Sequence, residues 1–315
     1  MKTTAARLVE HGRPLEVTEV DLPAPSADEV EMEMAYGGVN PVDRYRALGK
    51  VDAGSPVPRT LGAEGAGLVD GKPFVVFGHG VGATRDGIWA TRAVVPRSAL
   101  IEVPDGVELR HAAVMGVAGV TAWRTVTELG RVTPDDRVLV LGASGGVGST
   151  IVSLVHRLGA TVWGQSGDPG NVEWLRAQGA DRVVVGDVHD LVERVNELQP
   201  SVVFDPLGGG FTGAAIEALA PRGRLVIFGT SAGPTGTVPL QTIYRSALRI
   251  LGYGGLRDPD NVHRAGLLEA LRALAEHRLS VVVGRTLPLS AVNKALELIA
   301  ERAVRGKIAL DLREG

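Results

Sequence analysis

A glycine-rich turn follows a short apolar run and precedes an amphipathic segment, an arrangement suited to binding phosphate. Residues 137–141 form a continuous apolar run that predicts a buried parallel strand, and 149–158 carries apolar residues at helical spacing. The first N–H groups of such a helix have no intrahelical partner, so together with the helix dipole they can hold a pyrophosphate. A second apolar strand at 161–164 completes a βαβ unit of about thirty residues. The turn consists of Gly142, Ala143, Ser144, Gly145, Gly146, Val147 and Gly148.

The elements around this turn favour a dinucleotide site over a glycine-rich turn that binds nothing. From about residue 116 helices and strands alternate, which predicts an α/β fold with a doubly wound parallel Rossmann sheet. The expected helices are 117–129, 149–158, 171–178, 189–198 and 213–219. The expected strands are 137–141, 161–164, 182–185, 201–205, 224–229 and an apolar edge strand at 243–251. Asp205 ends one of them before a proline, where capping of the turn is favoured over catalysis.

The first part of the chain is β-rich. Short strands are expected at 5–9, 15–20, 30–36, 67–69, 74–77 and 93–95. Two polar, glycine-rich segments between them, 37–49 and 61–67, have the composition of functional loops.

The C-terminal part holds too few elements for a separate domain. They are a helix at 261–277, a strand at 281–283, a helix with Ser290 as N-cap and a closing strand at 307–310. We therefore expect a nucleotide-binding domain of residues 116–255, inserted into a discontinuous domain of residues 1–115 and 256–315.

The composition is that of an ordinary globular protein, with 44% hydrophobic and 22% charged residues among 315. A net charge of -3 gives no general attraction to nucleic acid or to anionic membranes, so neither is expected as a partner. There is no apolar signal core, and the longest weakly polar run, 112–123, is too short to cross a bilayer. We expect a cytoplasmic protein.

A metal site is not expected. The chain has no cysteine, which excludes disulfides, thiolate catalysis and cysteine-ligated zinc. The seven histidines show no ligand spacing, such as i, i+4 on one helix.

Eight short motifs along nearly the whole chain resemble the medium-chain dehydrogenase/reductase superfamily, and within it the zinc-free quinone oxidoreductase branch. They are GVNPVD (38–43), LGAEGAG (61–67), GVTAW (119–123), GASGGVG (142–148), QGAD (178–181), VFDPLGG (203–209), GRLVIFG (223–229) and RGKIAL (305–310). The glycine turn and the compact segment 67–78 also resemble the acryloyl-CoA reductase relatives. The resemblance implies a β-rich GroES-like catalytic domain, hydride transfer from a reduced nicotinamide, and a homodimer paired through strand 243–251.

For Asn40 and Tyr45 the resemblance implies a catalytic place at the nicotinamide and substrate end. From the residues alone, Asn40 is equally an Asx turn before Pro41, and Tyr45 is equally a half-buried packing aromatic. Hydride arriving at the β-carbon of an enone leaves an enolate, which needs hydrogen bonds at oxygen and a proton at the α-carbon. Asn40 can only donate a hydrogen bond, whereas the Tyr45 phenol can also supply a proton.

The cofactor contacts that the resemblance implies are spread over residues 121–245. Thr121, Phe228 and Gly229 are implied at the nicotinamide. The pyrophosphate is implied to lie on the turn of Gly142, Ser144, Gly145, Gly146, Val147 and Gly148.

NADPH is the expected cofactor, with NADH as the alternative. A NAD-specific site usually presents an acidic side chain at the end of the second strand, and here that end is Gln-Ser-Gly at 165–167, with Ser166 as the expected contact. The lysine and tyrosine that NADPH-using relatives carry are matched by Asn171 and Gly186. Arg245 is therefore expected to supply positive charge to the 2′-phosphate.

The chain also departs from the family. Ala63 and Glu64 stand where zinc-dependent relatives carry a His-Glu pair, so we interpret Glu64 as a hydrogen-bonding residue rather than a ligand. Val51 stands where many quinone reductases have a tyrosine, which removes a stacking partner for a quinone.

Three functions are compatible with these features. The leading one is a zinc-independent NADPH-dependent reductase that transfers hydride to a quinone or to the β-carbon of an α,β-unsaturated carbonyl. The second is an enoyl-thioester reductase for acyl-CoA or carrier-bound substrates, which would need room for a long carrier arm. The third is a nucleotide-bound structural or sensor protein without turnover, because a dinucleotide fold does not fix an activity.

Overall fold

The computed structural model describes residues 1–314, apart from the side chain of Leu256. The chain divides into two compact units. The β-rich unit comprises Met1–Val120, Pro259–Ala275 and the chain from Val281 onward, and the Rossmann unit comprises Thr121–Asp258 and Glu276–Ser280. The domain limits expected from the sequence, residues 116–255 for one domain and residues 1–115 with 256–315 for the other, stay a prediction. Within the described chain, no helix combines the length and the apolar character needed to cross a membrane.

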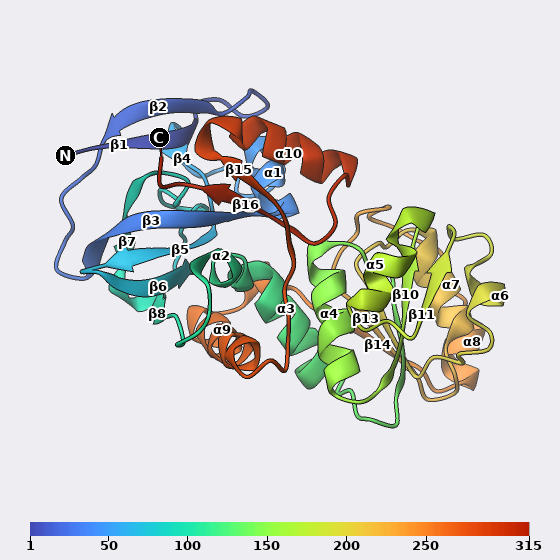
Figure 1. Cartoon of the computed structure of the whole chain (residues 1–315). Coiled ribbons are helices and arrows are strands. Elements are labelled where there is room, and N and C mark those ends of the chain that lie inside the picture. Colours follow the sequence, from blue (N-terminus) through green and yellow to red (C-terminus); the bar gives the residue numbers. More distant parts are fainter. Residues whose placement is uncertain (315) are drawn as a thin grey trace. The chain divides into compact units, whose positions relative to one another are not determined.

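A six-stranded parallel sheet forms the core of the Rossmann unit, in the order β11-β10-β9-β12-β13-β14 (Figure 1). This is the doubly wound order of a dinucleotide-binding sheet, which confirms the predicted fold class. The strands are β9 (Arg137–Val140), β10 (Thr161–Ser166), β11 (Arg182–Val185), β12 (Val202–Asp205), β13 (Arg224–Ile227) and β14 (Arg249–Gly252). The helices are α4 (Gly146–Arg157), α5 (Val172–Ala177), α6 (Leu191–Arg194), α7 (Gly210–Ala218) and α8 (Leu240–Arg245).

The prediction of one edge strand over 243–251 is wrong in its first half. Residues 240–245 form α8, and only Arg249–Gly252 form the edge strand β14. Ile243 and Leu248 pack against the apolar cluster that contains the buried residues of α7. The apolar residues of this segment therefore serve helix packing first and strand pairing only at its end.

The helix predicted over 117–129 exists but is wound irregularly. A π-helical segment, η2 (Met115–Gly119), leads into α3 (Val120–Arg124), which is followed by a second π-helical segment, η3 (Thr125–Leu129). The hydroxyl of Thr125 donates to the carbonyl of Thr121 at 2.6 Å, and competition of this kind bends helices.

Two sheets form the β-rich unit. One has the order β15-β16-β3-β5-β6-β8, with β7 also pairing β3, and the other has the order β2-β1-β4 (Figure 1). The strands are β1 (Lys2–Leu8), β2 (Glu16–Asp21), β3 (Glu29–Val39), β4 (Arg59–Thr60), β5 (Glu64–Val69), β6 (Lys72–Phe77), β7 (Arg92–Pro96), β8 (Leu100–Glu102), β15 (Val283–Pro288) and β16 (Lys307–Asp311). The helices are α1 (Pro41–Ala47), α2 (Leu109–Ala112), α9 (Asp260–Ala275) and α10 (Val292–Glu301). Each of the six strands predicted before residue 100 is present.

The two predicted glycine-rich loops are largely regular structure. Strand β3 continues through Val39 into α1, and β5 begins at Glu64. Gly37 and Gly38 lie within β3. A Cβ on Gly37 would come within 2.7 Å of Trp89, and a Cβ on Gly38 within 2.4 Å of Glu64, so neither position has room for a side chain. These glycines serve close packing, not flexibility.

The C-terminal elements differ from prediction at their starts. Strand β15 begins at Val283, where the predicted strand 281–283 ends, and Ala291 is the N-cap of α10 in place of Ser290. Ser290 instead belongs to a short 3-10 turn, η6 (Leu289–Ala291). The closing strand is confirmed as β16, which pairs antiparallel with β3 and so carries Lys307 to the end of that strand.

Candidate functional site

The glycine turn after β9 has the backbone geometry of a phosphate cradle. Gly142 adopts φ +56°, which is open mainly to glycine, and Gly145 is the N-cap of α4. A Cβ on Gly148 would lie 2.5 Å from the carbonyl oxygen of Gly142, so the first turn of α4 packs directly on the end of the strand. The N–H groups of this first turn are free of intrahelical bonds, as an anion site requires.

Gln165 braces this turn, a role that the sequence-based prediction missed. The side chain is 3% exposed, and its Oε1 accepts the N–H of Gly142 at 3.0 Å. Its Nε2 donates to the carbonyl of Gly186 at 2.7 Å, which ties the end of β10 to the end of β11. A polar residue at the end of a buried strand was the signal that could have pointed to it.

At the end of β10, Ser166 organises the next turn. Its hydroxyl accepts the Nδ2 of Asn171 at 2.9 Å and the N–H of Asp168 at 3.2 Å. The Asp168 carboxylate accepts the N–H of Gly170 at 2.8 Å. Ser166 and the glycine turn lie at the carboxyl ends of adjacent strands, β10 and β9, as the cofactor prediction requires.

Phe228 and Gly229 follow β13 at the same edge of the sheet. The N–H of Phe228 donates to the carbonyl of Asp205 at 2.9 Å, and a Cβ on Gly229 would meet the carbonyl oxygen of Pro206 at 2.6 Å. Asp205 is fully buried and accepts bonds from the Leu207 N–H (2.8 Å), the Gly208 N–H (3.0 Å) and the Thr212 hydroxyl (2.6 Å). The turn-capping interpretation of Asp205 is confirmed.

Arg245 does not lie near Ser166. Arg245 is the last residue of α8. The carbonyl of the next residue, Ser246, accepts the N–H of Arg222 at 2.7 Å, and Arg222 comes just before β13. Arg245 therefore lies toward the amino end of β13. Ser166 is at the carboxyl end of β10, and at about 4.8 Å per strand the separation from β13 across the sheet is on the order of 14 Å. The Arg245 guanidinium lies over the ring of Tyr244, 5.9 Å from its centroid. The structure thus does not bring Arg245 to the expected 2′-phosphate position.

Thr121, at the start of α3, is buried, and its side chain lies near the phenol of Tyr253. Burial raises the pKa of the Tyr253 phenol, and the Thr121 side chain opposes that shift. The guanidinium of Arg124 lies 5.4 Å from the centroid of the same ring. Tyr253 was not singled out from the sequence.

In the β-rich unit, Asn40 lies at the junction of β3 and α1 and is 2% exposed. Its Nδ2 donates to Oε1 of Glu64 at 2.6 Å, and its Oδ1 accepts from the ammonium of Lys307. Glu64 is fully buried, and its Oε2 accepts the N–H of Val117 at 2.7 Å. The interpretation of Glu64 as a hydrogen-bonding residue is confirmed, whereas Lys307 was missed because nothing local in RGKIAL points to Asn40.

Asp43, on the first turn of α1, is the other ionisable group at this junction. It is fully buried, and burial raises the pKa of its carboxyl to about 6, against the attraction of Arg46. Tyr45 lies on the same helix and is 36% exposed, so its side chain reaches the surface. Asn40 and Tyr45 therefore belong to one helix, with Asn40 as the N-cap of α1, and their place at the nicotinamide stays a prediction.

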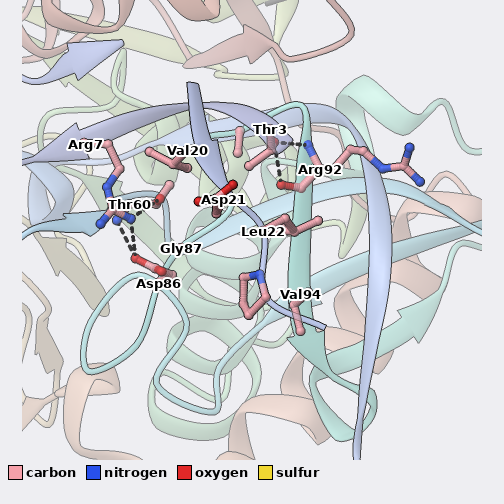
Figure 2. Close-up of a pocket in the computed structure, with 13 residues that line it drawn as sticks. Thr3, Arg7, Val20, Asp21, Leu22, Thr60, Asp86, Gly87, Arg92 and Val94 are labelled. Carbon is pink, nitrogen blue, oxygen red and sulfur yellow. Dashed lines mark hydrogen bonds and ion pairs between the residues drawn. The ribbon is translucent and has the colours of Figure 1, made fainter. Parts of the chain in front are cut away.

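A cavity of about 50 Å³ in the β-rich unit is shown in Figure 2. Arg7 closes one side of it by donating to Thr60 and Asp86, each at 2.9 Å, and Thr3 bonds the carbonyl of Arg92. A space of this size holds a few water molecules and no substrate. None of the predicted site residues lines it.

Within residues 1–314, no three or more histidine, aspartate or glutamate side chains lie together so that they could hold a metal ion. Position 63 is an alanine, and the neighbouring Glu64 uses both carboxylate oxygens in hydrogen bonds within the protein.

Comparison with known proteins agrees with this architecture. A family model described as zinc-binding dehydrogenase matches residues 178–310. The putative quinone oxidoreductase YhfP of Bacillus subtilis (strain 168) is 29% identical over 314 residues, covering 94% of this chain and 93% of that protein. Among solved structures, a NAD-dependent alcohol dehydrogenase gives a TM-score of 0.89 at 28% identity, over 98% of this chain and 99% of that one. The quinone oxidoreductase of Thermus thermophilus, solved alone and with NADPH, gives 0.85 at 26% identity, over 99% and 100%.

The sheet order, the glycine turn and these likenesses agree from one end of the chain to the other. The fold is that of medium-chain dehydrogenase/reductase structures, to which the chain is similar over nearly its whole length.

Proposed function

We propose that the protein is a zinc-independent reductase that uses NADPH to transfer a hydride to a quinone or to the β-carbon of an α,β-unsaturated carbonyl. The observation that carries the proposal is the glycine turn between β9 and α4, with Gly142 at φ +56° and Gly148 packed against its carbonyl. The quinone oxidoreductase names of the similar proteins support it, as does the NADPH complex of one of them.

The residues of the turn fit a dinucleotide. Around Gly145 the nearest atom to an added Cβ is 3.4 Å away, so the backbone here is open on the side that a methyl group would occupy. The N–H groups of Gly146 and Val147, at the amino end of α4, would hold the pyrophosphate, with Ser144 beside them. When bound, a reduced nicotinamide supplies the hydride, and the protein supplies orientation and hydrogen bonds.

Asn40 and Tyr45 have different parts in the proposed reaction. An enolate oxygen needs a donor that is already in place, and the Asn40 amide is held by two charged groups in a buried setting. Tyr45, with its side chain at the surface, would deliver a proton to the α-carbon or leave that step to solvent.

One assay tests the proposal: oxidation of NADPH and NADH with a quinone, a simple enone and crotonyl-CoA, before and after treatment with a chelator. We expect turnover with the quinone or the enone and no loss after chelation. The highest kcat/KM with crotonyl-CoA would instead favour an enoyl-thioester reductase. If no acceptor is reduced, or if the chelator abolishes activity, the proposal is wrong.

We also propose a homodimer that pairs through the edge of the Rossmann sheet. Strand β14 is the last strand of the sheet, and three large apolar side chains near it are exposed: Ile250 (39%), Tyr244 (67%) and Leu240 (72%). An open edge beside apolar side chains is a typical pairing surface. Light scattering should give the mass of two chains for the wild type and of one chain for Ile250→Asp, and a monomeric wild type would contradict the proposal.

A further inference from the structure

The side-chain amide of Asn40 is bound on both sides by charged groups inside the β-rich unit. Lys307 donates to its Oδ1, and Glu64 accepts from its Nδ2 at 2.6 Å. An ammonium can only donate and a carboxylate can only accept. If the amide were reversed, its NH2 group would face the Lys307 ammonium and its oxygen would face the Glu64 carboxylate. Only one orientation of Asn40 therefore satisfies both partners.

The two partners are themselves fixed. Lys307 uses its three N–H bonds on the Val39 carbonyl (3.3 Å), on Asn40 and on Glu64 (2.9 Å). The second oxygen of Glu64 accepts the N–H of Val117 at 2.7 Å. Lys307 is 5% exposed and Glu64 is fully buried, so neither side chain has solvent to turn toward.

Backbone packing leaves Glu64 no alternative position. A Cβ on Gly38 would come within 2.4 Å of its Oε1, and a Cβ on Gly116 within 3.0 Å of its Oε2. The carboxylate therefore fills the space that two glycines provide, between the end of β3 and the π-helical segment η2.

We propose that Lys307 and Glu64 are positioning residues that hold the Asn40 amide as a ready hydrogen-bond donor for the substrate oxygen. One Nδ2 hydrogen is used by Glu64, which leaves the second for a ligand. A donor that needs no reorientation during the reaction stabilises developing charge most effectively. This inference rests on the proposed function, because it assigns the pair a task in the same reaction.

A double-mutant cycle tests whether Lys307 acts through Asn40. Lys307→Met should lower kcat for an enone by about tenfold, since the freed amide samples unproductive orientations, while the KM for NADPH stays within about twofold. In an Asn40→Ala background the same change should cost less than about twofold. The matched control is Lys294→Met, because Lys294 is an exposed lysine of the same unit that pairs with Glu297 at the surface. Equal losses in both backgrounds would overturn the proposal.

Removing one member of a buried ion pair can prevent folding. The variant Glu64→Gln/Lys307→Met removes both charges and should have a circular dichroism spectrum like that of the wild type. Its kcat should also fall by about tenfold, and this loss should shrink to less than about twofold in the Asn40→Ala background. A tenfold loss that persists in the Asn40→Ala background would again contradict the proposal.

A spectroscopic readout keeps this inference separate from the proposed function. In ¹⁵N-labelled wild type, the side-chain amide of Asn40, assigned by its disappearance in Asn40→Ala, should exchange slowly with water and show proton shifts displaced from those of exposed asparagines. Fast exchange and shifts like those of exposed asparagines would overturn the inference even in an active enzyme. If no acceptor is reduced but the amide is held, the proposed function fails and the positioning by Lys307 and Glu64 stands.

Discussion

The Asp43 carboxylate accepts the backbone N–H of Asn40 at 2.9 Å through its Oδ2, although the side chain is fully buried. Its other oxygen lies 3.8 Å from the guanidinium of Arg46 and has no hydrogen-bond partner in residues 1–314. The group that caps α1 is therefore incompletely paired. Burial raises its pKa to about 6, so it changes charge close to neutral pH.

We expect Asp43 to stabilise the protein less as the pH rises toward neutrality. Its folded-state pKa of about 6 lies above the ordinary value of 3.8, so the contribution is full below that ordinary value and is lost as the pH rises through about 6. Desolvation of the ion is the main cause, and the Glu64 charge adds to it, while Arg46, the Asn40 N–H and Lys307 oppose it. The whole change corresponds to roughly 3 kcal/mol.

Asp43→Asn isolates this effect, since the amide oxygen can still accept the Asn40 N–H but does not titrate. Free energies of unfolding in urea should be compared at several values from about pH 4 to about pH 8. The variant should gain stability relative to the wild type as the pH rises. Parallel pH curves for the two proteins would show that Asp43 has an ordinary pKa.

Asn40→Ala should lower single-turnover cofactor oxidation with an enone by about a hundredfold, because an oxyanion donor is lost from a dry site. Cofactor affinity should change little, since Asn40 belongs to the β-rich unit and the glycine turn to the Rossmann unit. Tyr45→Phe should cost less, because the exposed Tyr45 competes with solvent as proton donor. A rate for Asn40→Ala within about threefold of wild type, roughly 0.7 kcal/mol, would remove Asn40 from the catalytic residues.

The Rossmann unit was predictable because its signals are local. Val138 and Val140 lie in an apolar run next to a glycine turn and a helical repeat, and within about thirty residues these patterns define a βαβ unit. The prediction of the edge strand failed at Ile243, whose side chain packs as part of a helix. An apolar residue in a short segment fits a helix as well as a strand.

The network around Asn40 was not predictable from spacing. Glu64 and Lys307 meet because β5 and β16 both pair with β3, and they are 243 residues apart in the chain. Gly38 was interpreted as part of a functional loop, but it is a glycine of β3 that packs against Glu64. A single sequence does not distinguish these uses of glycine, because the difference lies in a residue from a distant strand.

NADPH should give a higher kcat/KM than NADH. The end of β10 presents the neutral Ser166 and Asn171, and the Asp168 carboxylate accepts the Gly170 N–H, so no acidic side chain stands at the end of the strand to hold a ribose 2′-hydroxyl. Arg245→Ala should leave the KM for NADPH unchanged, since Arg245 lies toward the amino edge of the sheet, over Tyr244. Steady-state kinetics with both cofactors check both points. A higher kcat/KM with NADH contradicts the preference, and a raised KM for NADPH in Arg245→Ala contradicts the placement.

Two alanine substitutions in the glycine turn should separate stability from cofactor binding. Gly148→Ala places a Cβ 2.5 Å from the Gly142 carbonyl oxygen, an overpacking that typically costs about 1–3 kcal/mol and should lower the Tm.

Gly145→Ala has an ordinary φ of -74° and no atom closer than 3.4 Å to the new methyl group, so the fold should be retained. The methyl group would nevertheless occupy the open side of the backbone where a pyrophosphate approaches, and we expect the Kd for NADPH to rise by about tenfold or more. Gly54→Ala, with open space around its Cβ and a place in the β-rich unit, is the matched control and should change neither quantity. Thermal unfolding and fluorescence titration with NADPH measure both effects, and tight NADPH binding by Gly145→Ala would mean that the backbone at the start of α4 is not the phosphate site.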